Sequence, residues 1–569
     1  MTIVSIVGTI LVAVGSLVVI NRYFSFKLHK NTYPVTLSLL SLNMMILLST
    51  TYLLPLDLYY SATSGSSYED PVSNSTVLLQ RSTESLTKLL HTKLDAVQHN
   101  YRIIWLIIYW LEFVLCWITI PILISYVSLK YYASRVEVKE RIKKAIFQNI
   151  KFYLISAVGI IIGIIYLIAT TGHAIGDLKS LLISLAHLYS LSYMLLLLSS
   201  GLILLPSHLL SQGRLPTEES NNRLFVELSK TNDDMNDSQL VMNENATIIL
   251  QTPELNNGDV TFNDVLSNCK IEVQSLLAEL KITNPNSVLH SQANIVTLDK
   301  LNSVYNKFIT QYYNFLYYRE HSNSIIHTLA HANSPSVSNL KRLVIIFFGI
   351  ICMFLSILVF FLELIPIRWA HGWLFFGSRW YNFSLQFIIL SYNTLVSLYA
   401  MSKFKFSNFH LIPNGRSNPS NALYYSLYSS RLLFPICFNL MSLIPTNNDT
   451  IASKSSFETT LYYDLKIIPL VNMLNRYAPI VFMILVPISY QYDLKQKVLL
   501  RVLGEEYYYQ FFGMMLYEPV SSPSEGTSDP LSSNNENRRR MDEDYAYSLQ
   551  DGRYLFERAS SNYNMFDRS

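Results

Sequence analysis

The sequence predicts an all-α, polytopic membrane protein with about nine transmembrane helices, five before and four after a polar block. Half of the 569 residues are hydrophobic and only 15% are charged, a composition too apolar for a set of ordinary soluble domains. Several apolar runs are long enough to cross the roughly 30 Å hydrocarbon layer of a bilayer. Residues 207–342 are instead rich in Asn, Asp, Glu, Lys and Ser and cannot lie in lipid. This block must therefore lie in water.

Charge and motif content argue against several functional classes. The net charge of +3 is spread along the chain, without a basic stripe interleaved with aromatic residues, so nucleic-acid binding is not expected. Three of the four cysteines fall in apolar runs and the fourth, Cys269, falls in the polar block, which leaves none placed for an extracellular disulfide. The sequence lacks HExxH, GxSxG, a phosphate-binding glycine loop and paired metal-ligand spacings. We expect no enzymatic activity, no metal and no cofactor.

The first five spans set the topology. They are predicted at residues 2–20, 33–56, 103–126, 152–170 and 181–205. The first is uncharged and is followed by another apolar stretch without a cleavage site, so we interpret it as a span and not a signal peptide. Arg22, Lys27 and Lys30 follow it, and the connector at 130–151 carries seven basic residues against two acidic ones. The excess of basic residues places both connectors in the cytosol and the N-terminus outside.

Proline is expected to end two of these helices. The second span closes with the sequence Leu54-Pro55-Leu56-Asp57, where a proline and a carboxylate should stop the helix at the outer face. The fifth closes at residues 201–206, which end in Pro206. After five crossings the polar block is expected to lie in the cytosol.

The last four spans and the outer loops complete this arrangement. The spans are predicted at residues 343–364, 381–401, 421–444 and 477–490. Nine crossings from an external N-terminus leave the C-terminus in the cytosol. Two outer loops contain the N-glycosylation acceptor pattern at Asn74 and Asn448, so we predict a glycoprotein.

Within the polar block, residues 217–263 have the composition of a flexible linker. Apolar residues then recur at spacings of three and four on each side of Asn284-Pro285-Asn286, a helix stop and turn signal. The second of these sets comprises Leu298, Leu301, Tyr305, Phe308, Tyr312 and Phe315. They predict an antiparallel helical hairpin over about 264–318, either a free coiled-coil arm that binds a protein partner or two amphipathic helices packed against the membrane domain. Residues 518–569 are expected to be a disordered tail.

Four ionisable residues lie at or near membrane depth: Glu112, Glu363, Arg431 and Asp57. A charge at the centre of a span costs about 2.5–3.5 kcal/mol, so each needs a partner, a water-filled cavity or a route to the interface. Arg431 stands four residues before Pro435, which frees a backbone carbonyl near it. If Arg431 pairs with Glu112 or Glu363, the two residues form either a buried ligand site or an ion pair that stabilises the bundle. The further alternative is that Arg431 lies near the cytosolic interface. The lone histidines in or near spans, His187 among them, are interpreted as packed or interfacial residues.

Several motifs resemble the limb-region (LMBR-like) membrane protein family, most of all its branch called LMBR domain-containing protein two. They are Leu54-Pro55-Leu56-Asp57, residues 201–206, Glu363, the Arg431-x-x-x-Pro435-x-x-x-Asn439 pattern of the eighth span and residues 501–506. The resemblance covers about 1–205 and 343–510. It implies a nine-span receptor or adaptor with an external N-terminus, whose relatives are linked to lipocalin uptake, lysosomal cobalamin handling and regulation of G-protein-coupled receptor signalling.

The domain organisation expected is membrane spans at 1–206, a cytosolic block at 207–342, membrane spans at 343–500, and a short helix with a tail at 501–569. The function expected is that of a receptor or signalling scaffold in the plasma membrane or an endolysosomal membrane, with the hairpin binding a cytosolic or membrane protein. The alternative is a transporter or lipid-handling protein in which Arg431, Glu112 and Glu363 line a cavity for an anionic or amphipathic ligand. No particular small molecule is indicated.

Overall fold

The computed structural model describes residues 2–24, 34–65, 77–132, 138–171, 178–213, 217–254, 260–280, 295, 297–332, 339–365, 374, 378–403, 409–412, 415–444, 455–462, 469–491 and 533–566. These residues are almost entirely helical, and the β-pairing among them is a single bridge between Phe24 and Arg416. The predicted all-α class is confirmed.

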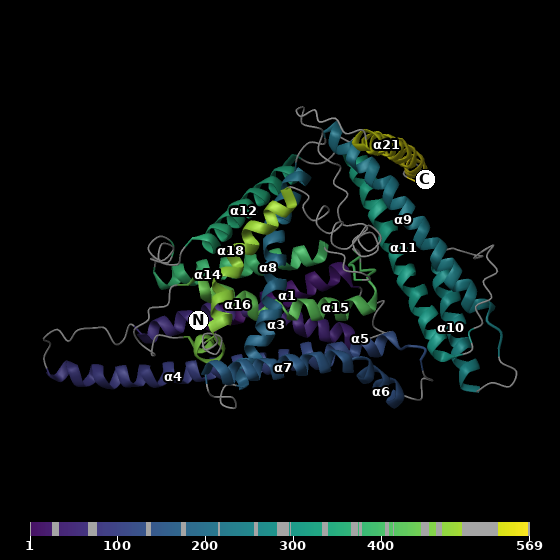
Figure 1. Ribbon diagram of the computed structural model, residues 1–569. Helices are drawn as coiled ribbons and strands as arrows, with labels where there is room; N and C mark the ends of the chain where they lie inside the picture. Colours follow the sequence, from purple (N-terminus) through teal and green to yellow (C-terminus); the bar gives the residue numbers. More distant parts are fainter. Residues whose placement is uncertain are drawn as a thin grey trace.

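The membrane part is formed by two groups of helices (Figure 1). The first comprises α1 (Thr2–Tyr23), α3 (Pro34–Gly65), α4 (Val77–Val114), η2 (Leu115–Thr119), α5 (Ile120–Ser128), α6 (Val138–Gln148), α7 (Ile150–Thr171) and α8 (Leu178–Gly213). The second comprises α12 (Asn339–Leu364), α14 (Arg379–Lys403), α15 (Pro419–Ser430), α16 (Leu433–Leu443), η4 (Glu458–Tyr462) and α18 (Pro469–Gln491).

Six of the described helices are long and apolar enough to span a bilayer, or seven if the bent pair α6 and α7 forms one span. A helix lies at each of the nine predicted positions, but the count of nine is not confirmed. The predicted eighth span consists of α15 and α16, which have only 12 and 11 residues. The apolar part of α18, Met473–Ser489, is also shorter than a full span.

Helix α8 lies at the centre of the membrane part and packs against α12, α14 and α18 (Figure 1). At Gly201 a Cβ atom would overlap the backbone carbonyl oxygen of Val396 on α14. Only glycine permits this close approach of two helix backbones. Outer helices have the opposite pattern, because they turn apolar side chains outward, as at Ile155 of α7, which is 73% exposed.

The expectation that proline ends the second and fifth spans is wrong. Pro55 lies inside α3, which continues to Gly65, and Pro206 lies inside α8, which continues to Gly213. A proline removes one backbone donor, and membrane helices tolerate this where neighbouring helices pack around them. Asp57 stays in α3 because donors from other segments surround its carboxylate, as described below.

The polar block forms three helices, α9 (Glu218–Gln251), α10 (Val260–Glu279) and α11 (Leu298–Ala332), on the right of Figure 1. The expectation of a flexible linker at 217–263 is therefore wrong. Thr217 caps α9 by accepting a hydrogen bond from the Ser220 backbone N–H at 3.3 Å. Met242, Ala246 and Ile249 form a buried stripe at helical spacing, which the surrounding Asn and Asp residues conceal in composition alone.

The two predicted amphipathic helices are confirmed as α10 and α11, but their apolar faces are not exposed. Together with α9 they enclose one core. Of the predicted binding residues, Leu301, Tyr305, Phe308, Tyr312 and Phe315 are buried and Leu298 is partly buried. The buried members of this set cannot form the contact surface of a free arm, because they pack in a core that α11 shares with α9 and α10. We call α9, α10, α11 and the C-terminal helix below the helical unit.

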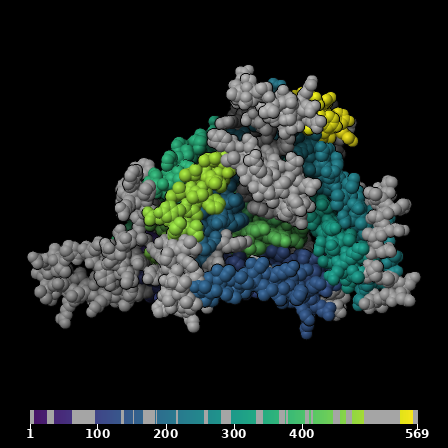
Figure 2. Space-filling view, viewed as in Figure 1, coloured from purple at the N-terminus to yellow at the C-terminus, as the bar shows by residue number. Residues whose placement is uncertain are grey.

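The C-terminal tail is not wholly disordered, in contrast to the expectation. Helix α21 (Ser533–Phe566) packs along the first half of α9, and its yellow surface lies at the upper right of Figure 2. Leu555 and Phe556 of α21 join an apolar cluster around Leu228 of α9 and Leu329 of α11. The tail has too few apolar residues to fold alone, but this contact with α9 and α11 buries the ones it has.

Candidate functional site

A cavity of ≈ 50 Å³ lies inside the membrane part, where α4, η2 and α8 meet the break between α15 and α16. It is lined by Tyr109, Glu112, Phe113, Cys116, Trp117, Ile183, His187, Ser190, Ser430, Arg431, Phe434, Pro435 and Phe438. A space of this size can hold a few water molecules. Five aromatic side chains line it, together with Glu112, Arg431 and His187.

A widened turn shapes one wall of the cavity. Immediately after α4, residues Leu115–Thr119 form a π-helical turn in which the Ile120 N–H bonds to the Leu115 carbonyl. Pro121 follows at once. In a regular α-helix its ring would clash with the carbonyl of Trp117, four residues earlier, and it has no N–H to donate to that carbonyl. Such π turns are frequent at functional sites. Here the turn places Cys116 and Trp117 at the cavity wall.

The opposite wall is a broken helix. Helix α15 ends at Ser430, α16 starts at Leu433, and Arg431 lies at the break. Pro435 explains the break, because it lacks an N–H and its ring clashes with the carbonyl four residues earlier, which is that of Arg431. The Arg431 guanidinium lies 5.7 Å from the centroid of the Tyr428 ring, a cation–π distance.

Glu112 is the most unusual residue of the cavity. Its side chain is only 3% exposed, and neither carboxyl oxygen accepts a hydrogen bond from the described residues within normal geometry. The Ser430 hydroxyl interacts with this carboxyl group, but its hydrogen bond within normal geometry goes to the Leu427 carbonyl at 2.9 Å. A buried carboxyl group without donors is costly. Glu112 therefore marks the cavity as a candidate binding site.

His187 is a cavity residue that sequence reasoning treated as simple packing. Its Nε2 contacts the Asn475 side-chain oxygen of α18, and its ring meets the Phe438 ring edge-on at 4.9 Å. Nδ1 is buried without a hydrogen-bond partner among the described residues. The only sequence signal was a histidine inside an apolar run, which does not reveal a partner 288 residues away.

The structure brings Arg431 and Glu112 to one cavity but places Glu363 elsewhere. Glu363, near the end of α12, accepts a hydrogen bond from the Asn439 side chain of α16 and does not line the cavity. Asn439 is the last residue of the Arg-x-x-x-Pro-x-x-x-Asn pattern. That pattern thus contributes Arg431 and Pro435 to the cavity wall and Asn439 to a buried polar contact between helices.

Asp57 does not line the cavity but joins neighbouring segments. It is fully buried, and its two oxygens accept hydrogen bonds from the backbone N–H groups of Ser456 at 3.1 Å and Phe457 at 2.7 Å and from the Trp105 indole at 3.2 Å. A carboxylate at the start of a helical turn satisfies free backbone donors. Asp57 therefore holds the segment that leads into η4 against α3 and α4.

The two predicted glycosylation residues, Asn74 and Asn448, lie outside the described residues.

A second polar site joins the helical unit to the membrane part. Lys130 Nζ, just after α5, lies 2.6 Å from Glu272 Oε1 of α10, and the hydroxyls of Tyr131 and Tyr305 also donate to this carboxylate. Burial by itself would raise the pKa of Glu272. The hydrogen bonds and the charge of Lys130, aided by the two hydroxyls, outweigh burial and lower this pKa below its usual value.

The same site uses backbone groups of the turn after α5. The Asn302 side chain of α11 accepts from the Tyr131 N–H at 3.0 Å and donates to the Ser128 carbonyl at 3.0 Å, and Asn306 donates to the same carbonyl at 2.8 Å. These asparagines satisfy groups left free where α5 ends. We call Ser128, Lys130, Tyr131, Glu272, Asn302, Tyr305 and Asn306 the docking node.

Comparison with known proteins places the chain in a family. The family model of the LMBR1-like membrane proteins matches residues 1–491. A relative from Caenorhabditis briggsae, the G-protein coupled receptor-associated protein LMBRD2, is 23% identical over 439 residues. That match covers 68% of this chain and 66% of the relative, slightly less than two thirds of its length. No solved structure matches. The chain belongs to the LMBR1-like membrane protein family.

Proposed function

We propose that this chain is a non-enzymatic membrane adaptor that acts in receptor signalling or trafficking, and that a protein partner binds its helical unit. The name of the C. briggsae relative, a receptor-associated protein, supports the link to receptors. The observation that carries the proposal is the docking node, because it fixes a water-exposed helical unit to membrane helices at a defined position. An adaptor needs such a fixed position to present a partner to a receptor in the same membrane.

The surface available to a partner differs from the set of α11 residues that the sequence suggested. Leu240 of α9 and Ile271 of α10 are each 62% exposed, and Val241 beside Leu240 is 36% exposed, on helices whose outer faces are mainly polar. Exposed aliphatic side chains of this kind contribute apolar contact area in protein–protein recognition. We assign partner binding to the outer faces of α9 and α10 around these two residues.

Crosslinked affinity capture from intact membranes tests the assignment. The full chain is compared with a Leu240→Ser, Ile271→Ser variant. Each change removes an aliphatic side chain worth about 1.5–3 kcal/mol when fully buried, so a partner that uses both should be recovered at least tenfold less. The matched control, Asn236→Ser with Gln274→Ser, changes exposed polar residues one turn away on the same helices.

A set of proteins lost from the Leu240/Ile271 variant and retained by the control supports the assignment. Equal recovery of partners by the wild type, the Leu240/Ile271 variant and the control, at equal abundance and location, contradicts it. Surface substitutions are preferable to deletion of residues 264–318, because deletion removes the buried core of the helical unit.

A transporter or lipid-handling role is the second candidate, and the cavity favours it. Glu112 lines this cavity, and its carboxyl oxygens accept no hydrogen bond from the described residues. Arg431 and the rings of tyrosine, phenylalanine, tryptophan and histidine residues line the same space. Acidic and basic groups on aromatic walls suit the polar head of an amphipathic molecule.

The two candidates separate on mutation. Glu112→Gln and Arg431→Leu should abolish the cellular activity of a transporter while partner capture stays at the wild-type level. The Leu240/Ile271 variant should do the reverse. If the cavity variants retain full activity at normal protein levels, the cavity is not the functional site.

We further propose that the N-terminus lies outside the cell or in an organelle lumen, with the helical unit in the cytosol of a plasma-membrane or endolysosomal protein. Support comes from the basic connector, which includes Lys130 of the docking node. In Figure 1 the marked N-terminus lies on the opposite side of the membrane helices from α9, α10 and α11.

A further inference from the structure

Helix α6 combines a packed face with an exposed face of a different chemistry. Arg141 donates to the Tyr126 carbonyl of α5 at 2.7 and 3.0 Å and stacks 4.0 Å from the Tyr126 ring centroid. Ala145, one turn later, is fully buried, and Asn149 donates to Ser125 Oγ at 2.8 Å. These contacts fix one face of α6 against α5, so the rotation of the helix about its axis is set.

The face opposite to these contacts carries two lysines and one glutamate, Glu140, at its start and apolar residues at its end. Lys139 and Lys143 are exposed and form no ion pair within the described part of the chain. Ile146 and Phe147 follow one turn later, and Phe147 is 67% exposed. A single exposed apolar side chain is common, but a contiguous apolar patch marks a protein or membrane interaction site.

The apolar end of this face continues the lipid-facing surface of α7. Exposed Ile150, Leu154, Ile155, Val158 and Ile162 follow at helical spacing along α7, and α6 meets α7 at a bend of 43°. Helices α6 and α7 lie at the lower edge of Figure 1. From α7 into α6, the exposed residues change from apolar side chains to Lys143 and Lys139 within two turns. Such a change marks the depth at which hydrocarbon ends and headgroups begin.

We propose that α6 is an interfacial helix that binds anionic phospholipid headgroups, with Ile146 and Phe147 in the acyl region and Lys139 and Lys143 on the phosphates. The occupant is the membrane leaflet on the side of the helical unit, since the surface is continuous with the exposed apolar surface of α7. Lys144, on the flank of α6, lies 3.8 Å from Asp299 of α11 and 4.7 Å from the Tyr132 ring centroid. The lipid contact therefore lies next to the junction with the helical unit.

Lipid quenching at α6 tests the proposal. The full chain, with a fluorophore on Gln148→Cys, is placed in phosphatidylcholine nanodiscs that contain small amounts of brominated phosphatidylserine or brominated phosphatidylcholine. Gln148 is exposed at the end of α6. Bromine quenches only nearby fluorophores, so the two lipids report the composition beside α6. Phosphatidylserine should quench at lower mole fraction than phosphatidylcholine.

The key comparison is Lys139→Gln with Lys143→Gln against a charge-matched control, Lys307→Gln with Arg558→Gln, which removes two exposed charges from α11 and α21. The α6 variant should lose about fivefold in phosphatidylserine preference for each lysine, while the control keeps it. Equal quenching by both lipids in the wild type, or an unchanged preference in the α6 variant, would overturn the proposal. An equal loss in the control would also overturn it, because net charge alone would then explain the preference.

Inorganic phosphate at constant ionic strength distinguishes a lipid surface from a site for a free anion. If α6 binds the membrane, phosphate should weaken the preference no more than chloride does. A specific loss with phosphate would assign the lysines to a soluble anion and contradict the lipid proposal.

Discussion

At the residue scale, hydrogen-bond partners divide the buried carboxyl groups into two kinds. Asp57 accepts three hydrogen bonds and Glu363 accepts one from Asn439, so both are parts of the bundle structure. Glu112 accepts none from the described residues and faces a cavity. All three were recognisable in the sequence as charges at membrane depth. The partners of Asp57 and Glu363 were not, because they come from segments distant in the chain and only the fold brings them together.

The Asp57→Asn substitution should destabilise the protein. An amide group cannot accept on both sides, so its N–H₂ would face a backbone donor of Ser456 or Phe457. Hydrogen bonds to a charged group contribute about 1.5–3 kcal/mol each, and we expect a loss of about 2 kcal/mol. Thermal unfolding in detergent measures it, with Asp237→Asn on the exposed face of α9 as the control. Equal melting of both variants would show that Asp57 does not hold the η4 segment.

The docking node should depend on pH through Glu272. Because its folded pKa is below its unfolded value, its stabilisation is present above about pH 4.3. It is lost as the pH falls through the lowered folded pKa. Glu272→Gln should therefore lower the unfolding free energy by about 2 kcal/mol at neutral pH, and its difference from the wild type should vanish in more acidic solution.

Thermal unfolding of both proteins from neutral pH to about pH 3.5 measures this difference. Glu254→Gln, an exposed change outside the node, provides the baseline. A difference between wild type and Glu272→Gln that stays constant over the whole range would contradict the ionised Lys130–Glu272 contact.

At the element scale, hydrophobic periodicity located the helices but not all of their ends. The apolar spans and the faces of α10 and α11 followed from spacing, since burial imposes a helical period. Pro55 and Pro206 misled because the usual rule for helix ends holds in water, whereas surrounding helices stabilise a helix with an internal proline in a membrane. Helix α9 and the C-terminal helix were missed because their polar composition resembles that of linkers, and only contact with each other and with α11 reveals their buried stripes.

Helix α21 should be removable from α9 by a single substitution. A Cβ atom at Gly552 would overlap the Phe225 carbonyl, so Gly552→Leu cannot dock as the wild type does. Nearby contacts would be lost with it, including Ser229 Oγ to Asp551 at 2.7 Å and Arg553 to Asn222 at 2.9 Å. Leucine favours helix more than glycine does, so any effect reports the docking contact and not helix stability.

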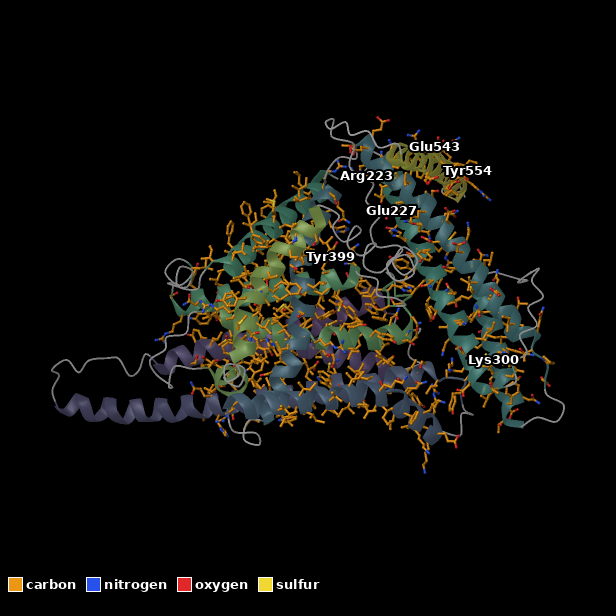
Figure 3. All side chains as sticks on the ribbon, viewed as in Figure 1. Arg223, Glu227, Lys300, Tyr399, Glu543 and Tyr554 are labelled. Carbon is orange, nitrogen blue, oxygen red and sulfur yellow. The ribbon has the colours of Figure 1, made fainter. Side chains whose placement is uncertain are left out.

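Hydrogen exchange measures the loss of the contact between α21 and α9. Amides of α21 should lose protection in Gly552→Leu and keep it in Ser561→Leu, which adds the same side chain at an exposed position. Figure 3 shows Glu543 and Tyr554 of α21 next to Arg223 and Glu227 of α9, and far from Lys300 at the start of α11. Protection should therefore stay unchanged around Lys300. Wild-type protection of α21 in Gly552→Leu would contradict the docked arrangement.

At the scale of the whole molecule, a bundle of membrane helices carries a helical unit on one side, joined through the docking node (Figures 1 and 2). The division into membrane parts and a polar block could be predicted from composition. The position of the block could not, because it depends on contacts between Asn302, Asn306 and one backbone carbonyl. The candidate cavity also needed the fold, since its walls come from α4, α8 and the α15–α16 break.

The proposed topology predicts which asparagines carry glycans. On that topology Asn74 and Asn448 would face outward and should be modified, whereas the acceptor pattern at Asn245 should stay unmodified because α9 would lie in the cytosol. Glycosidase digestion of the wild type, Asn74→Gln and Asn448→Gln in cells checks this by gel mobility. A glycan on Asn245 would contradict this topology, because it would place α9 on the outer side of the membrane.

The most direct measurement of the adaptor role is receptor signalling in cells that lack the protein. Agonist-evoked second messenger and receptor surface level are compared after return of the wild type, the Leu240→Ser, Ile271→Ser variant, or the Asn236→Ser, Gln274→Ser control, at equal abundance. An adaptor that binds its partner through α9 and α10 predicts restored signalling with the wild type and the control and a loss with the Leu240/Ile271 variant. Full restoration by that variant, or no effect of the wild type on any receptor tested, would contradict the proposed function.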